Sequence, residues 1–180
     1  MAFGIKIENV VASASLGVPI KLEKLVATMD GVEYEPEQFP GLVLRMKEPK
    51  AAALIFSSSK IVCTGAKSPG DAKIVIAKIV VKVNKLGFKV PPNYKVKLEN
   101  IVASAKLQRE LNLDQIAFTL ENTEYEPEQF PGLVYRMDDP KVTFLLFGSG
   151  KIICTGGRSI ADVGRAVVRL DKRLRALGRK

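Results

Sequence analysis

The chain has no histidine and no tryptophan, and only two of its 180 residues are cysteines. Histidine is the commonest general base and a frequent metal ligand, so its absence removes the usual means of building a proton-transfer or metal site. The sequence also lacks a glycine-rich phosphate loop and the GxSxG turn that presents a nucleophilic serine. We therefore predict that the protein is not an enzyme and that it needs no metal or cofactor.

The two cysteines stand at equivalent places, Cys63 in KIVCTG and Cys154 in KIICTG. Neither lies in a CxxC or Cys/His spacing, so the sequence indicates no metal site. We interpret both as small buried core residues, and their redox state stays open.

Long uninterrupted apolar runs are also missing. The stretch from Ile74 to Val83 contains Lys78 and Lys82, whereas a membrane span needs roughly 20 apolar residues. The N-terminal MAFGIKIENVV lacks the basic and apolar regions of a secretory signal. With 47% hydrophobic and 26% charged residues, the composition is typical of a globular protein.

The sequence is duplicated. The string EYEPEQFPGLV occurs at Glu33–Val43 and again at Glu124–Val134, and residues 5–88 align with 96–179 without a gap. About 37 of the 84 aligned pairs are identical. We predict two repeats, residues 1–91 and 92–180, that together form a single body.

Each repeat has the same predicted elements. Each repeat begins with a strand of alternating polarity (5–14 and 96–105), which is followed by a short helix (21–27 and 112–118). The two prolines of EYEPEQFPGLV exclude a helix in that string, so we predict a brief edge strand and a loop there. Three strands and a long helix complete the unit (42–46, 51–56, 60–65 and 71–86 in the first repeat). The sequence thus predicts an α+β fold with one curved antiparallel sheet of about ten strands.

These strands are apolar on both faces. In 51–56, Ala52, Leu54 and Phe56 alternate with the equally apolar Ala51, Ala53 and Ile55. The long helices can cover only one face, so the other is a broad apolar surface that implies a partner.

Positive charge is concentrated in the two long helices. Of the 28 Lys and Arg residues, 14 lie in 67–89 and 158–180, with only 3 of the 19 Asp and Glu. The net charge of +9 weakly indicates an acidic partner. We interpret the helices as a solvated outer surface, with a role in holding acidic regulators or distant DNA as the alternative.

Several long motifs carry a family resemblance: ENVVASA and ENIVASA, the doubled EYEPEQFPGLV, an RM pair followed by PK, and SxKIxCTG. Over nearly the whole chain these resemble the TATA-box-binding protein family, and FPG in both repeats without an N-terminal extension resembles its archaeal members. The resemblance implies a saddle-shaped sheet with helices on its convex face. It also implies a cytoplasmic, nucleoid-associated general transcription initiation factor that binds the TATA box in the DNA minor groove and bends the duplex.

The resemblance, together with the physics of the groove, gives candidate base contacts. At A·T pairs the minor groove offers only acceptors, whereas G·C adds a projecting amino donor that an apolar sheet would leave unpaired. The apolar contacts are Val11, Leu54, Val62, Val102, Leu145 and Ile153, with Thr64 and Thr155 as small polar contacts. Asn9 and Asn100 are expected to donate to base acceptors; the alternative for both is a strand-end cap or turn contact.

The resemblance also makes four phenylalanines wedges between base steps: Phe39, Phe56, Phe130 and Phe147. The alternative is four core side chains. The phosphate contacts implied are Arg45, Ser58, Lys60, Arg136, Ser149 and Lys151.

The acidic letters of the repeated string suggest a second surface. Glu33, Glu35 and Glu37, like Glu124, Glu126 and Glu128, would repel phosphates, so we expect them to face away from DNA. In the family the second loop contacts transcription factor B, which corresponds here to Glu126, Glu128 and Gln129 and leads indirectly to RNA polymerase. The alternative is a solvated charged loop.

Two other functions compete with this one. An interaction scaffold whose apolar sheet binds another polypeptide would show little preference between A·T and G·C duplexes. A related module attached to a nucleic-acid enzyme is disfavoured, since the sequence shows no second domain.

Overall fold

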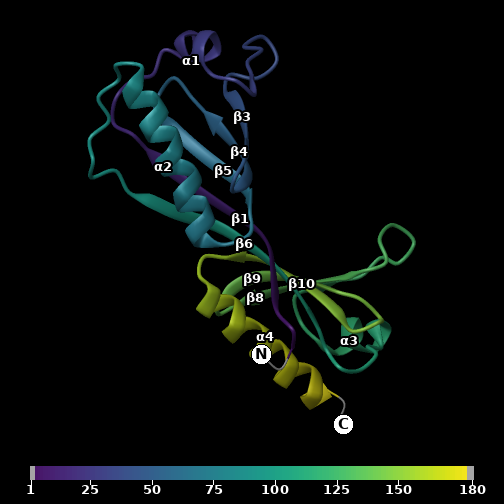
Figure 1. Ribbon diagram of the computed structural model, residues 1–180. Helices are drawn as coiled ribbons and strands as arrows, with labels where there is room; N and C mark the ends of the chain where they lie inside the picture. Colours follow the sequence, from purple (N-terminus) through teal and green to yellow (C-terminus); the bar gives the residue numbers. More distant parts are fainter. Residues whose placement is uncertain (1–2, 178–180) are drawn as a thin grey trace. The chain divides into compact units, whose positions relative to one another are not determined.

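A computed structural model of the chain describes residues 3–177. Strand, helix, four strands and helix follow one another twice, as predicted (Figure 1). The first repeat comprises β1 (Lys6–Ser15), α1 (Leu22–Thr28), β2 (Val32–Glu33), β3 (Leu42–Lys47), β4 (Lys50–Ile55), β5 (Lys60–Ala66) and α2 (Pro69–Lys85). The second comprises β6 (Val96–Lys106), α3 (Leu113–Thr119), β7 (Thr123–Glu124), β8 (Leu133–Asp138), β9 (Lys141–Leu146), β10 (Lys151–Gly157) and α4 (Ile160–Leu177).

The strands of the described chain follow the order β2-β3-β4-β5-β1-β6-β10-β9-β8-β7 in a ten-stranded sheet. Neighbouring strands within each repeat pair antiparallel. This confirms the predicted α+β class with ten strands.

The chain forms two compact units whose boundaries cross the repeats. One unit is Asn9–Glu99, and the other joins the N-terminal residues up to Glu8 to the chain from Asn100 onward. In the unit that contains the second repeat, the Lys106 N–H donates to the Phe3 carbonyl (3.0 Å) and the Ser104 hydroxyl donates to Glu8 Oε1 (2.9 Å). In the unit Asn9–Glu99, the Ser13 hydroxyl donates to Glu99 Oε1 (2.7 Å). The start of each repeat's first strand therefore packs with the other repeat.

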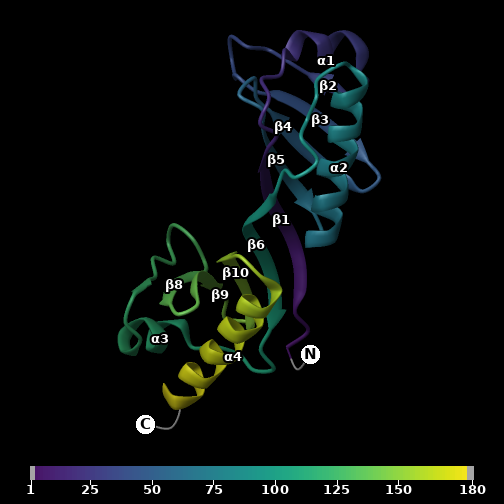
Figure 2. The ribbon, with the colours of Figure 1, turned by 90° about the vertical axis from the view of Figure 1, so that its left-hand side faces the viewer.

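In each unit the long helix covers one face of the strands (Figure 2). Helix α2 packs on β4 and β5, and α4 packs on β10. The strand residues on the covered face are buried, among them Ala53 and Ile55 in β4 and Phe144 and Leu146 in β9. Removal of these apolar side chains from water is the main driving force for each unit.

Serine caps position both long helices. The Ser68 hydroxyl accepts a hydrogen bond from the Asp71 N–H, and Ser159 does the same for Asp162, each at 3.0 Å. Pro69 stands in the first turn of α2, where its missing N–H costs nothing. Both long helices thus begin at a serine N-cap.

Cys63 and Cys154 are buried, as predicted. Burial raises the pKa of the Cys63 thiol to about 11 and that of Cys154 to about 12, so both are protonated at neutral pH. Within residues 3–177, no group of three or more His, Cys, Asp or Glu side chains is placed to hold a metal ion. No helix of this part of the chain is long and apolar enough to cross a membrane.

Candidate nucleic-acid interface

Each unit leaves the strand face opposite its long helix open. In the first unit Val43 lies opposite Leu54, which lies opposite Val62, and all three are half-buried. The same register joins the half-buried Val134, Leu145 and Ile153 in the second. Val11 and Val102, on the neighbouring β1 and β6, are also half-buried. Each unit therefore presents an apolar strip that a partner could cover.

A row of three residues that begins with an arginine and ends with a threonine runs beside each strip. Arg45 pairs with Ala52 across β3 and β4, and Ala52 pairs with Thr64. In the second repeat the same row is Arg136, Thr143 and Thr155. Each row thus has an exposed arginine at one end and a half-buried threonine hydroxyl at the other. A ligand could therefore place an anionic group at the arginine and a polar group at the threonine.

The two candidate asparagines are held by backbone hydrogen bonds. The Gly65 N–H donates to Asn9 Oδ1 at 2.6 Å, and the Gly156 N–H donates to Asn100 Oδ1 at the same distance. Both glycines have a positive φ, +90° and +97°, which is strained for other residues. The turn contact considered as an alternative is thus present in both repeats.

This contact fixes which end of each amide is presented. Because Oδ1 is occupied by a backbone donor, Nδ2 is the remaining end, and it has two N–H groups. One approaches the neighbouring threonine hydroxyl, at 3.4 Å for Asn9 and Thr64 and 3.3 Å for Asn100 and Thr155. The second N–H is available to an acceptor on a ligand, so the turn contact orients the donor instead of excluding it.

The candidate phenylalanines form a pair in each repeat. Phe39 is 40% and Phe130 is 42% exposed, which is inconsistent with a core role for these two. Phe39 packs edge-on against the half-buried Phe56 with ring centroids 5.8 Å apart, and Phe130 packs against Phe147 at 6.0 Å. Such an arrangement stabilises the ring orientation in the free protein.

Two glycines that sequence reasoning missed seat these rings. A Cβ on Gly41 would lie 2.7 Å from Phe39 Cε2 and 2.9 Å from Phe56 Cε1. A Cβ on Gly132 would lie 2.7 Å from Phe130 Cε2 and 3.0 Å from Phe147 Cε1. These contacts are shorter than van der Waals distance, so the rings in their present positions leave no room for a side chain at either glycine. The signal was the recurrence of glycine after Phe-Pro in both repeats.

The candidate phosphate contacts are exposed, but the two arginines have carboxylate partners. Lys60, Lys151, Ser58 and Ser149 lie on the surface. Arg45 Nε is 3.6 Å from Glu33 Oε1, and Arg136 Nη1 is 2.8 Å from Glu124 Oε1. Glu33 and Glu124 therefore lie beside two candidate phosphate contacts, whereas we expected the carboxylates of the repeated string to face away from the DNA.

Strand register explains this difference. The short β2 pairs with β3 so that Glu33 lies opposite Val43, two residues from Arg45, and β7 places Glu124 opposite Val134 in the same way. Diagonal neighbours on one face of an antiparallel pair are within reach of long side chains. The brief edge strands were predicted, but the register in which they pair was not visible in the sequence.

The remaining acidic loop residues are exposed: Glu35, Glu37, Glu126, Glu128 and Gln129. The Gln129 and Phe130 N–H groups donate to the Glu126 carbonyl at 2.9 and 3.0 Å, which closes the second loop into a turn. A hollow of about 230 Å³ beside it is lined by Glu124, Glu126, Gln129, Phe130, Gly132 and Val134. The loop can thus offer carboxylates and an apolar ring edge together.

Fold and surface define a duplicated sheet-and-helix protein with an equivalent open apolar surface on each unit. A model of the family described as transcription factor TFIID, or TATA-binding protein (TBP), matches residues 4–86 and again 95–177. The chain belongs to this family. The family consists of DNA-binding transcription factors, which confirms the predicted resemblance and the prediction that the protein is not an enzyme.

Archaeal relatives match over nearly the full length. The TATA-box-binding protein of Methanobrevibacter smithii is 54% identical over 96% of this chain and 96% of its own, and that of Archaeoglobus fulgidus is 55% identical over 98% and 97%. The solved structure of Methanococcus jannaschii TBP superimposes with a TM-score of 0.88 at 52% identity, covering 98% of this chain and 99% of that one.

Proposed function

We propose that this protein is a general transcription initiation factor that binds the TATA-box element through the DNA minor groove and bends the duplex with its phenylalanines. It then recruits transcription factor B and, through it, RNA polymerase, at the nucleoid in the cytoplasm of an archaeal cell. The observation that carries the proposal is the duplicated surface, in which a half-exposed apolar strip adjoins an asparagine whose Nδ2 is the presented end.

The chemistry of the strip favours A·T pairs. Val11, Leu54 and Val62 in one unit, and Val102, Leu145 and Ile153 in the other, offer no acceptor for the guanine amino group, which would be buried unpaired. The Nδ2 groups of Asn9 and Asn100, beside Thr64 and Thr155, instead donate to the acceptors that A and T present. Affinity and A·T preference then have the same source.

The phenylalanine pairs supply the wedges. Unstacking a base step costs a few kcal/mol, and burial of one phenylalanine returns about 1.5–3 kcal/mol, so the two roughly balance. Gly41 and Gly132 and the edge-on packing hold the rings before DNA arrives, which reduces the ordering entropy lost on binding. The net affinity then rests on the strip and on the phosphates held by Arg45, Ser58, Lys60, Arg136, Ser149 and Lys151.

Transcription factor B is assigned to the second loop. Glu126, Glu128 and Gln129 are exposed beside the hollow that Phe130 lines, so the loop suits a partner with basic side chains. Its turn hydrogen bonds to the Glu126 carbonyl make the carboxylates a pre-ordered surface.

Equilibrium binding to fluorescent duplexes tests the DNA function. The duplexes carry a central TATA-like run or a G·C replacement, and the protein is wild type or Phe39→Ala with Phe130→Ala. The matched control is Phe118→Ala, which removes a phenylalanine that is 91% exposed on α3, outside the candidate surface. We expect A·T preference for wild type and Phe118→Ala and its loss in the double variant; equal binding of wild type to both duplexes would contradict the proposal and favour a protein ligand for the sheet.

A further inference from the structure

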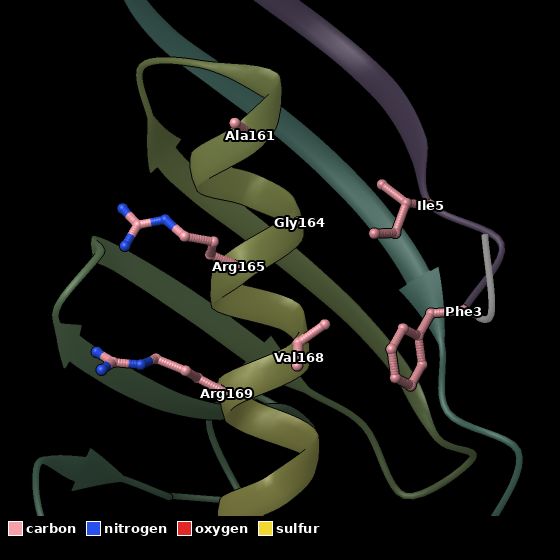
Figure 3. Close-up of a pocket in the computed structure, with 7 residues that line it drawn as sticks. All are labelled: Phe3, Ile5, Ala161, Gly164, Arg165, Val168 and Arg169. Atoms are coloured by element: carbon pink, nitrogen blue, oxygen red, sulfur yellow. The ribbon is translucent and has the colours of Figure 1, made fainter.

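A groove of about 640 Å³ separates α4 from the N-terminal segment within the unit that contains the second repeat (Figure 3). Phe3 and Ile5 project from the N-terminal segment towards the helix, and Val168 projects back towards them. The lining is completed by Ala161, Gly164, Arg165 and Arg169. The groove lies on the helix side of the unit, whereas the candidate DNA contacts lie on its open face.

The walls are apolar and held in place. The Lys106 N–H donates to the Phe3 carbonyl at 3.0 Å, which fixes one wall to β6. On the other wall Val168 is 43% exposed. A Cβ built on Gly164 meets nothing within 4 Å, so the space in front of the helix is open. Apolar grooves of this kind commonly mark a docking site.

The helix that forms the groove is strongly cationic at its surface. Helix α4 carries five Lys and Arg against two Asp, and one of those, Asp171, is buried in ion pairs with Arg109 (2.9 Å) and Arg175 (2.8 Å). Among the groove residues, Arg165 pairs with Asp162 at 2.9 Å and Arg169 with Asp139 at 3.1 Å. These ion pairs are exposed, and exposed ion pairs contribute about 0–1 kcal/mol to stability. A ligand carboxylate can therefore replace Asp162 or Asp139 as the partner of the arginine.

We propose that the groove docks an acidic amphipathic segment of a partner protein. The apolar side chains of the segment would lie between Val168 and the pair Phe3 and Ile5. Its carboxylates would reach across α4 to Arg165 and Arg169, whose guanidinium groups project from the other side of the helix (Figure 3). A nucleic-acid backbone matches the charge but offers no apolar group for the groove. A second copy of the chain would bring two cationic α4 helices together, which a net charge of +9 opposes.

The first repeat does not reproduce this groove lining, so it offers a control surface. At the aligned positions of α2, Gly164 is replaced by Lys73, Val168 by Ala77 and Arg169 by Lys78. Removal of the charges of Lys73 and Lys78 in α2 therefore changes the net charge as much as removal of the charges of Arg165 and Arg169 in α4, but it leaves the groove unaltered.

Selection of displayed random peptides of about 12 residues on the wild-type protein tests the proposal. An enriched peptide is then synthesised with a fluorescent label, and its Kd is measured by anisotropy at about 0.15 M salt. The variants are Gly164→Leu, which fills the groove, Arg165→Gln with Arg169→Gln, and the control Lys73→Gln with Lys78→Gln. Circular dichroism and binding to the TATA-like duplex, both expected to be unchanged in Gly164→Leu, show that the variant is folded.

We expect the enriched peptides to combine Asp or Glu with large apolar residues. Gly164→Leu and the arginine pair should each weaken binding about tenfold or more, and the lysine control by less than about twofold. Failure to enrich peptides, enrichment without acidic residues, or equal binding to Gly164→Leu would overturn the proposal. Sedimentation of a wild-type dimer that Gly164→Leu converts to monomer would overturn it in favour of a second copy.

Discussion

The two repeats are most alike on the open sheet face and most different on the helix side. Asn9, Phe39, Leu54 and Lys60 are identical to their counterparts in the second repeat. Behind the sheet, Arg109 and Asp171 form an ion pair at 2.9 Å where the aligned residues of the first repeat are Val18 and Val80. The open face thus differs only by small changes such as Val62 against Ile153, whereas the helix side has an ion pair in one repeat and two valines in the other.

The repeats also differ in which residue takes up a left-handed backbone. Ser59 has φ +82° where the second repeat has Gly150 at +94°. The buried Ser59 hydroxyl accepts from the Gly17 N–H at 3.1 Å. A Cβ on Gly150 would instead lie 2.4 Å from the Arg109 carbonyl oxygen and 2.6 Å from that of Leu107. The same turn therefore tolerates serine in one repeat and excludes it in the other.

Exchanging these two residues should give the largest effect. Gly150→Ser forces a side chain against two backbone carbonyls, so we expect a loss of about 3 kcal/mol or more in the free energy of unfolding. Ser59→Gly loses one hydrogen bond but removes the strain of a serine at φ +82°, so its net effect should be below about 1 kcal/mol. Urea unfolding of both variants measures the difference, and equal losses would show that the turns are interchangeable.

The Arg109–Asp171 ion pair should give the next largest effect. Asp171→Asn leaves Arg109, whose Nη2 is already buried without a partner among the described residues, with less compensation. We expect a loss of about 2 kcal/mol at pH 7. Replacing the pair by the residues of the first repeat, Arg109→Val with Asp171→Val, should cost less than the single change, because the only charge that loses its partner is the exposed Arg175 and no buried charge is left unpaired. A double variant that is less stable than Asp171→Asn would contradict this.

The pH dependence of the same pair has a definite sign. Burial raises the pKa of Asp171, but the hydrogen bonds and charges of Arg175 and Arg109 outweigh it and hold the pKa below its ordinary value. The folded protein therefore binds this proton less readily than the unfolded chain, so the contribution is present above about pH 4 and is lost as the pH falls further. The stability difference between wild type and Asp171→Asn should shrink below about pH 4. A constant difference would exclude the pair as its source.

Much of the fold was predictable because both repeats carry the same patterns. The alternation in 51–56 indicated two apolar faces, of which the long helices can cover only one, and Ser68 and Ser159 stand at the starts of the long helices as serine caps do. Three contacts were not predictable: the close approach of Gly41 to two phenylalanine rings, the hydrogen bond from the Gly65 N–H to Asn9, and the ion pair of Glu33 with Arg45. Each depends on the register between strands, which no single segment of sequence contains.

The glycines beneath the two phenylalanine pairs allow a direct comparison of the two halves of the proposed DNA site. Gly41→Ala and Gly132→Ala each force a pair of rings to shift, because the new Cβ would lie 2.7–3.0 Å from carbons of both rings. We expect each to weaken binding to the TATA-like duplex about fivefold, near 1 kcal/mol, with little change in stability. Unequal losses would show that one half of the protein contributes more to the complex. Unchanged affinity in both would mean that the rings do not need this seat.

The smallest effect concerns the arginines, because both are exposed. If Arg45, Lys60, Arg136 and Lys151 each neutralise one phosphate, the slope of log K against log salt is about −3.6, and the two lysines alone give about −1.8. The Glu124–Arg136 distance is 2.8 Å against 3.6 Å for Glu33–Arg45, so Arg136 is held more closely by its carboxylate. We expect Arg45→Gln to make the slope shallower by close to 0.9 and Arg136→Gln by less. Titrations between about 0.05 and 0.3 M salt measure both, and a wild-type slope steeper than about −7 would mean that other cations contact the DNA.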